Sequence, residues 1–432
     1  MPTDYRRVAD FLKIAIDGRS PEQLARFRPR HDSPPPRVPG GGSVDGTAIE
    51  ARWQLPGLTA AAREQLLDER TRREASAYER NIEHFIGTVR VPVGLIGPLR
   101  VNGLFAHGDY YVPLATTEAA LVASYSRGAR LLLEAGGCAT LVVNEGVSRA
   151  PGFAFDTTVD AALFIAWATT QLEQFRAAAA ATTKYGRLID LQITLEGNHV
   201  YLGFEFATGD AAGQNMVTIA TEAICRYIAA HTPIAPRYHF VEANLSGDKK
   251  ATSYSFMSVR GRKVTAEVRL PREVVEERLH TTTPTLIDYW RMSALGGVMS
   301  GSIGVQGHYA NGLTALFIAT GQDAACVAEA AVGVTRFEPL DDGGLYASVT
   351  LPNMIVGTVG GGTRLPTQRA CLEILGLAGE GHARAFSEVA AAVALAGELS
   401  ITGALAAGHF VEAHKQLARG PQAPTPGNQP PA

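Results

Sequence analysis

The segment RLIDLQITLEGNHVYLGFEFATGDAAGQNMVTIATEAICRYIAA, residues 187–230, decides the fold class. Apolar residues alternate with polar ones on both sides of the turn Glu196-Gly197-Asn198, which predicts a β-hairpin. The run after Thr208-Gly209-Asp210 predicts a helix with Asp210 as its N-cap. A hairpin followed by a helix, without a series of βαβ units, favours an α+β fold over a doubly wound sheet.

Other segments extend this pattern in both directions. A second hairpin is predicted near residues 252–270, and the Gly- and Pro-punctuated segment 90–103 predicts extended backbone. Helices are predicted at 59–84, 313–335 and 368–415. Two Pro/Gly-rich stretches, residues 32–46 and the tail from Gly420, are expected to be flexible.

Composition excludes several classes of protein. A net charge of −3 over 432 residues, without a basic run, argues against nucleic acid as a partner. Four separated cysteines without a CxxC pair are typical of free thiols in a reducing compartment. The N-terminus lacks an apolar signal region, and no uninterrupted apolar run reaches the length of a membrane span. We therefore expect a cytoplasmic protein that does not bind membranes.

Four segments place an ionisable residue in an apolar or glycine-rich setting. Glu118 is predicted at the start of an apolar helix, as either a first-turn carboxylate that favours the positive helix end or a proton donor. Asp248, Lys249 and Lys250 form either a charged surface turn or a site where lysine stabilises an oxyanion. Asp323 is predicted inside an Ala-rich helix, where a carboxylate needs a partner.

The fourth segment is close to the C-terminus. His409 and His414 are five residues apart, so they point in different directions on a helix, and HFVEAH matches neither HExxH nor HxxEH. We therefore expect no zinc site, and one of these histidines is a candidate general acid. The GxGxxG fingerprint of dinucleotide-binding folds is absent, although TGDAAGQNM offers a helix N-terminus suited to a pyrophosphate.

Seven runs, in order, resemble the 3-hydroxy-3-methylglutaryl-CoA reductases. They are FIGTVRVPVGLIGPL, LATTEAALVAS, TGDAAGQNM, GDKKA, TGQDAA, VGTVGGGT and ALAAGHFVEAH, between residues 78 and 415. The forms GTVGGGT and DKK are similar to the biosynthetic, NADPH-using branch of that family.

The resemblance implies roles for individual residues. It makes Glu118, Lys249, Asp323 and His414 catalytic, with His414 protonating the leaving CoA thiolate. The residues it assigns to the substrate are Ser124, Arg149, Asn244, Asp248, Lys250 and Asn311. Those it assigns to NADPH are Thr183, Lys184, Tyr185, Asp210, Gly213, Gln214, Asn215, Gly360, Gly361 and Gly362. The cation at Lys184 suits a 2′-phosphate, which favours NADPH over NADH.

The resemblance also implies an architecture. A flexible segment (1–55) and a helical arm (56–97) precede a large substrate domain (98–150 and 242–415) built around a long central helix. A small ferredoxin-like NADP domain (151–241) is inserted into it, and a flexible tail (416–432) follows. Family members are at least dimers with shared active sites, so Glu118 and Lys249 are expected to face a partner's Asp210 helix.

The implied reaction converts 3-hydroxy-3-methylglutaryl-CoA into mevalonate and CoA with two NADPH and without a metal. Three departures from the family pattern stand out: Glu242-Ala243 in place of Ser-Gly, Gln214 in place of Met, and Ile355 in place of Glu. The alternatives are NAD-dependent oxidation of mevalonate, a non-catalytic acyl-CoA-binding protein and, least favoured, a generic nucleotide-binding dehydrogenase.

Overall fold

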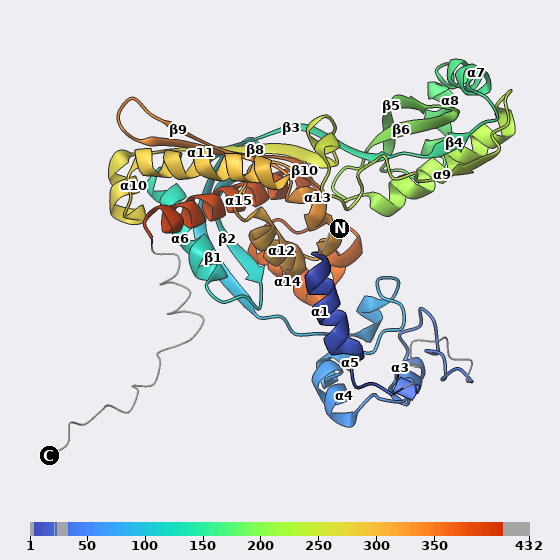
Figure 1. The fold of residues 1–432 in the computed structure, drawn as a ribbon, viewed down its shortest axis with the longest axis horizontal. Coiled ribbons are helices and arrows are strands. Elements are labelled where there is room, and N and C mark those ends of the chain that lie inside the picture. The colour runs from blue at the N-terminus through green and yellow to red at the C-terminus, as the bar shows by residue number, and fades with distance from the viewer. Residues whose placement is uncertain (1–3, 21, 24–32, 409–432) are drawn as a thin grey trace. The chain divides into compact units, whose positions relative to one another are not determined.

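The computed structural model describes residues 4–20, 22–23 and 33–408 (Figure 1). The chain divides into two compact units, Met1–Thr88 and Val89–Ala432.

The first unit contains short helices. They are α1 (Tyr5–Ile16), α3 (Gly46–Trp53), α4 (Ala60–Leu66), α5 (Glu69–Arg73) and the 3-10 helix η1 (Ala75–Tyr78). The run 59–84 is thus broken into several pieces, because Asp68 accepts the backbone N–H of Thr71 and starts a new helix inside it. The buried Arg52 donates to the carbonyls of Pro39, Ser43 and Phe85, which anchors part of the stretch expected to be a flexible linker.

The main sheet of the second unit is mostly antiparallel. Its strands are β1 (Val93–Gly103), β2 (His107–Ala115), β3 (Cys138–Arg149), β8 (Gly261–Leu270), β9 (Val334–Pro339) and β10 (Leu345–Met354). They pair in the order β3-β8-β10-β9, and β1 joins β2 antiparallel and β3 parallel. The mixture of helix and sheet is confirmed, and so is the extended backbone at 90–103.

Strand β3 continues beyond this sheet into a second group of elements (Figure 1). These are β4 (Gly152–Ala154), α7 (Thr158–Ala168), α8 (Leu172–Ala180), β5 (Arg187–Glu196), β6 (His199–Ala207), α9 (Gln214–His231) and β7 (Tyr238–Phe240). Their strands pair antiparallel in the order β7-β4-β6-β5. The predicted hairpin is confirmed, and Val200, Leu202, Phe204 and Phe206 all face the core.

The N-cap prediction for the following helix is wrong. Helix α9 begins at Gln214, with Gly213 as its N-cap at φ +78°. A β-carbon at Gly213 would lie 2.3 Å from the side chain of Thr208, so the turn requires glycine. Asp210 instead accepts the N–H groups of Gly381 and Ala383, at the start of a different helix.

That helix, α15 (Ala383–Ala406), forms the core of the second unit. It contacts β8, β10, α6 (Leu121–Glu134) and α12 (Tyr309–Thr320). Small residues permit this packing: a β-carbon at Gly128 would lie 1.9 Å from the carbonyl oxygen of Ala396. Among the helices of the described residues, α15 alone is long and apolar enough to cross a membrane, yet 83% of its most apolar window is buried in the protein. Such burial is typical of a core helix.

Three further predictions need correction. Residues 252–270 do not form a hairpin: η2 (Ser253–Phe256) precedes β8, whose partners are β3 and β10. The run 313–335 contains the end of α12, η3 (Ala324–Cys326), α13 (Val327–Ala330) and the start of β9. The run 368–415 contains α14 (Pro366–Ile374) and α15, separated by a loop with three positive-φ glycines, Gly376, Gly379 and Gly381.

The remaining elements complete the second unit. They are α10 (Arg272–Leu279), α11 (Thr283–Ser300) and the 3-10 helix η4 (Gly361–Arg364).

Candidate active site

Lys249 and Asp323 form an ion pair at the centre of the candidate site. The Nζ atom of Lys249 lies 2.8 Å from Oδ2 of Asp323, and both side chains are a little under half exposed. The hydrogen bond to Asp323 raises the pKa of Lys249, so lysine is cationic throughout the neutral range. Asp323 does not lie inside a helix as predicted: Gly321 ends α12, and Asp323 caps η3 by accepting the N–H of Ala325.

The loop that carries Lys249 is fixed by buried charges. Asp248 accepts from Nη1 of Arg149 at 2.9 Å and from Nη2 of Arg260 at 2.7 Å. Burial raises the pKa of Asp248, but the two arginines outweigh burial and hold the pKa below its usual value. Asp248 is therefore an anion shared by two guanidinium groups.

Glu242, one of the departures from the family pattern, also organises this loop. Its carboxylate accepts from Arg149, from the N–H of Asn244 at 2.7 Å and from the hydroxyl of Ser246 at 3.0 Å. Lys250 is exposed, and its Nζ donates to the carbonyl of Asp248 at 2.8 Å. The residues expected to hold substrate are therefore bonded mainly to one another.

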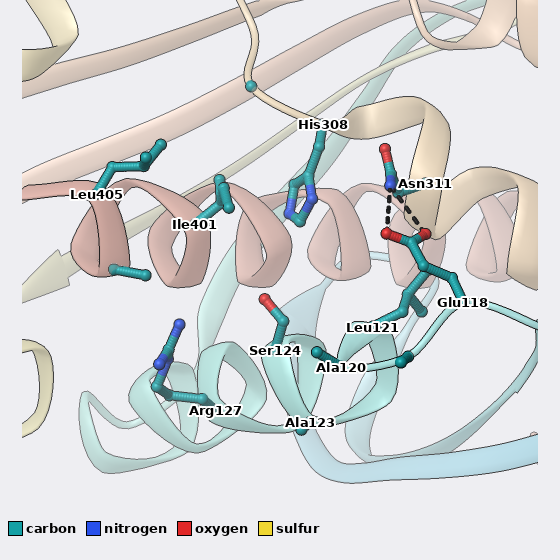
Figure 2. A pocket seen from close by; sticks show the side chains of 13 residues that line it. Glu118, Ala120, Leu121, Ala123, Ser124, Arg127, His308, Asn311, Ile401 and Leu405 are labelled. Atoms are coloured by element: carbon teal, nitrogen blue, oxygen red, sulfur yellow. Dashed lines mark hydrogen bonds between the residues drawn. The ribbon is translucent and has the colours of Figure 1, made fainter. Parts of the chain in front are cut away.

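Glu118 forms a separate polar pair with Asn311. The amide of Asn311 donates to both carboxylate oxygens of Glu118, at 3.0 and 3.3 Å (Figure 2). Helix α6 begins only at Leu121, so the interpretation of Glu118 as a first-turn carboxylate is wrong. Asn311 lies in the first turn of α12, and its side chain binds Glu118.

A cavity of about 380 Å³ extends from Glu118 between α6 and the C-terminal end of α15 (Figure 2). Ser124 lines it and shares a hydrogen bond with Ser400 at 2.9 Å. Arg127, which donates to the hydroxyl and the carbonyl of Ser400, supplies a cation at the wall. His308 lies beside Asn311, with its ring stacked on Tyr125 and its Nε2 3.0 Å from the carbonyl of Gly397.

Helix α12 connects the two polar pairs. Asn311 lies near its start, and Asp323 follows its end. From Asn311 to Thr320 the helix rises about 14 Å, at 1.5 Å per residue. Within one chain, the Glu118 pair and the Lys249 pair are therefore at opposite ends of one rigid element.

Three glycine-rich motifs meet near the Lys249 pair. The backbone N–H of Thr358 donates to the carbonyl of Asp210 at 2.9 Å, and the side chain of Gln322 bonds both the N–H and the carbonyl of Gly357. A β-carbon at Gly362 would lie 2.5 Å from the carbonyl oxygen of Gly321. Gly360 and Gly361 instead have open space where a side chain would be.

The side chain of Gln214 joins this cluster to the ion pair. Its amide donates to Sγ of Cys326 at 2.7 Å, three residues after Asp323. This contact gives a structural reason for glutamine at a position where the family often has methionine. Within one chain the Asp210 loop therefore lies in the same cluster as Cys326 and Asp323. The contact with a partner's Asp210 helix, which the resemblance implies, stays a prediction.

The Thr183-Lys184-Tyr185 segment lies against the first turn of α9. The hydroxyl of Thr183 donates to Sδ of Met216 and accepts the N–H groups of Tyr185 and Gly186. Lys184 and Tyr185 are exposed, as is Asn215 in α9. His409 and His414 lie outside the described residues, and within those residues no cluster of metal-ligating side chains occurs.

Comparison with known proteins identifies the family. The model of the hydroxymethylglutaryl-coenzyme A reductase family matches residues 48–419. The chain belongs to this family. It is 43% identical over 351 residues to the 3-hydroxy-3-methylglutaryl-coenzyme A reductase of Methanocaldococcus jannaschii, which covers 80% of this chain and 86% of that protein. It is 44% identical over 348 residues to that of Pyrococcus abyssi, covering 79% and 85%.

A solved structure supports the fold. The class II 3-hydroxy-3-methylglutaryl-CoA reductase from Streptococcus pneumoniae, bound to NADPH in open conformations, superposes with a TM-score of 0.63. The match covers 80% of this chain and 84% of that chain at 18% identity.

Sequence reasoning missed four polar residues near the site: Arg127, Arg260, His308 and Glu329. Arg260 lies within the segment predicted to be a second hairpin, whereas its guanidinium is buried in an ion pair with Glu329. Glu329 carried the same signal as Asp323, a lone carboxylate in an Ala-rich apolar run. Arg127 and His308 offered no local signal.

Proposed function

We propose that this chain reduces 3-hydroxy-3-methylglutaryl-CoA to mevalonate and CoA with two NADPH. The observation that carries the proposal is the Lys249–Asp323 ion pair, held beside the glycine-rich cluster in a chain of this family. A lysine kept cationic by a carboxylate suits a reaction in which negative charge develops on a thioester carbonyl oxygen.

The residues near α9 fit a phosphorylated dinucleotide. The first N–H groups of α9 have no partner within the helix, and such groups bind phosphate oxygens. The open space at Gly360 and Gly361 and the exposed cation of Lys184 extend this surface. When bound, NADPH supplies the hydride; we assign its contacts to Thr183, Lys184, Tyr185, Gly213, Gln214, Asn215 and Gly360–Gly362.

The chain's own residues provide charge and protons. Lys249 stabilises the oxyanion formed at the thioester carbon, and Asp323 keeps Lys249 charged. Glu118 protonates the alcohol oxygen of the second reduction, and Asn311 orients its carboxyl group. Arg149, Asp248 and Lys250 hold the substrate's carboxylate end together with Asn244, and Ser124 lines the entry for CoA. We assign His414 to protonation of the CoA thiolate.

We further propose that the working form is at least a homodimer. Because α12 rises about 14 Å between Asn311 and Thr320, we expect Glu118 and Lys249 of one chain to be too far apart to act on one carbon. A site that joins the Glu118 cavity of one chain to the Lys249 loop of its partner removes this difficulty. Four free, buried cysteines fit a cytoplasmic enzyme.

We also propose a domain assignment, supported by the order of the strands. Strand order β7-β4-β6-β5, with helices between β4 and β5 and between β6 and β7, is that of a ferredoxin-like unit and supports an NADP domain at residues 151–241. Residues 98–150 and 242–415 are then the substrate domain around α15.

The test is a spectrophotometric assay of the full chain with 3-hydroxy-3-methylglutaryl-CoA and either NADPH or NADH. We expect two NADPH oxidised per thioester consumed, with mevalonate as product, and loss of the NADPH preference in Lys184→Asp. Binding of both ligands without oxidation, together with unchanged behaviour of Lys249→Ala, would refute the proposal. Faster mevalonate oxidation with NAD would favour the catabolic alternative.

A further inference from the structure

A buried carboxylate contacts the backbone of Lys249. Glu329 of α13 is fully buried, and its Oε1 accepts the N–H of Lys249 at 3.2 Å. Lys249 has a φ of +56°, in the left-handed region. For a residue with a β-carbon this conformation is strained, so it persists only where the surroundings hold it.

The other oxygen of Glu329 is bound by a buried arginine. Oε2 accepts from Nε of Arg260 at 2.6 Å, and both side chains are at most 1% exposed. Arg260 also donates to the carbonyl of Ser148 at 2.6 Å and to Asp248 at 2.7 Å. The Arg260–Glu329 pair therefore binds the loop that carries Lys249 at two adjacent points, the side chain of Asp248 and the backbone N–H of Lys249.

We propose that Glu329, held by Arg260, is a positioning residue that sets the backbone of Lys249 and so directs its ammonium group to Asp323. Glu329 itself is fully buried, so it acts through Lys249 and not on substrate. The consequence for turnover rests on the proposed function. The geometric part does not.

The geometric part is testable by NMR of the full chain after reductive methylation with [13C]formaldehyde. The chain has only six lysines, at positions 13, 184, 249, 250, 263 and 415, so the spectrum is simple, and Lys249→Arg assigns the signal. In the native protein we expect Lys249 to titrate above the usual range of a lysine, because Asp323 raises its pKa. In Glu329→Ala the loop relaxes, the ion pair is lost, and the titration of Lys249 should fall back to the usual range.

Kinetic measurements distinguish a positioning role of Glu329 from a purely stabilising one. We expect Glu329→Ala to lower kcat by about 10²-fold, the loss typical of a small misplacement of a catalytic group, with KM values nearly unchanged. The matched control is Glu388→Ala, another fully buried glutamate, whose carboxylate accepts the N–H groups of Phe105 and Ala106. It should destabilise the protein and leave both kcat and the Lys249 titration unchanged.

Glu329→Gln keeps the test open if the alanine variant does not fold. Glutamine has the same shape but presents one oxygen and one N–H₂ group, so it satisfies Lys249 or Arg260 and not both. We expect the same changes on a smaller scale. The inference is overturned if either variant retains the high Lys249 titration, or if its kcat equals that of the Glu388 control. A native protein without reductase activity refutes the proposed function and leaves the titration result valid.

Discussion

Substitution of Asp210 separates two roles for a residue that the resemblance assigned to the cofactor. Its carboxylate accepts the N–H of Gly381 at 2.7 Å and that of Ala383 at 3.1 Å. His382, the N-cap residue of α15, makes no side-chain cap of its own. Asp210 thus performs from outside the task of an N-cap on the core helix.

The magnitude follows from these two bonds. Loss of an N-cap carboxylate costs about 1–2 kcal/mol, including its favourable interaction with the positive helix end. With a urea m value of about 3 kcal/mol per molar, Asp210→Ala should lower the unfolding midpoint by roughly 0.5 M. Asp210→Asn, which keeps an acceptor oxygen and caps about as well, should lower it much less.

The assay is urea unfolding followed by tryptophan fluorescence, with the KM for NADPH measured on the same preparations. Asp341→Asn, a change at an exposed turn aspartate between β9 and β10, serves as the control for loss of charge. The capping interpretation fails if Asp210→Ala unfolds at the native midpoint. It also fails if the alanine and asparagine variants raise the KM for NADPH equally without loss of stability, because that pattern belongs to a charged cofactor ligand.

Three further predictions concern the Lys249–Asp323 ion pair, the cavity and the loop carboxylate Asp248. Asp323→Asn should lower the pKa of Lys249 towards its usual value, because it removes the carboxylate that raises this pKa. The alkaline limb of the pH–kcat profile should therefore move to lower pH, and kcat should fall about 10–100-fold. An alkaline limb that does not move would show that Asp323 does not raise the pKa of Lys249. Arg127→Met should raise the KM for the CoA substrate by about tenfold with little change in kcat, because Arg127 lines the cavity at the end away from Glu118 (Figure 2). An unchanged KM would count against CoA entry there. Because the pKa of Asp248 is held below its usual value, its contribution to stability is present above that usual value and lost as pH falls through the lower, folded value. Asp248→Asn should therefore flatten the loss of stability in acid below about pH 4, measured by urea unfolding at several pH values.

Local patterns predicted the fold where local interactions decide it. The hairpin of β5 and β6 was predictable because alternation, turn and strand length are all contained in about 20 residues. The segment 252–270 was wrongly predicted to be a hairpin, although its second half does form a strand, β8. Arg260, inside this segment, binds Glu329 and Asn353, which lie 69 and 93 positions further along the chain. No local pattern carries such a contact.

The residues of the candidate site, like the fold, were predictable only in part. The resemblance supplied Lys249 and Asp323, and the structure joins them although they are 74 residues apart in sequence. It did not supply Glu329, although a lone carboxylate stands in an Ala-rich run there, because the group that Glu329 contacts is a backbone N–H, which every residue except proline has. For the same reason Asp210 was assigned to the helix that follows it in sequence and not to α15, 173 residues later.

Lysine is rare in this chain, and the positions of the few lysines indicate functional residues independently of the motifs. Six lysines stand among 39 basic residues, so arginine supplies most of the positive charge. Three of the six, Lys184, Lys249 and Lys250, fall within the candidate cofactor and substrate surfaces. Arginine binds carboxylates in a planar fork and does not deprotonate in proteins, whereas lysine is a compact charge on a rotatable stem. Stabilisation of an oxyanion requires a compact donor that approaches a single oxygen. Lys249→Arg preserves the charge beside Asp323, but we expect it to lose activity as Lys249→Ala does.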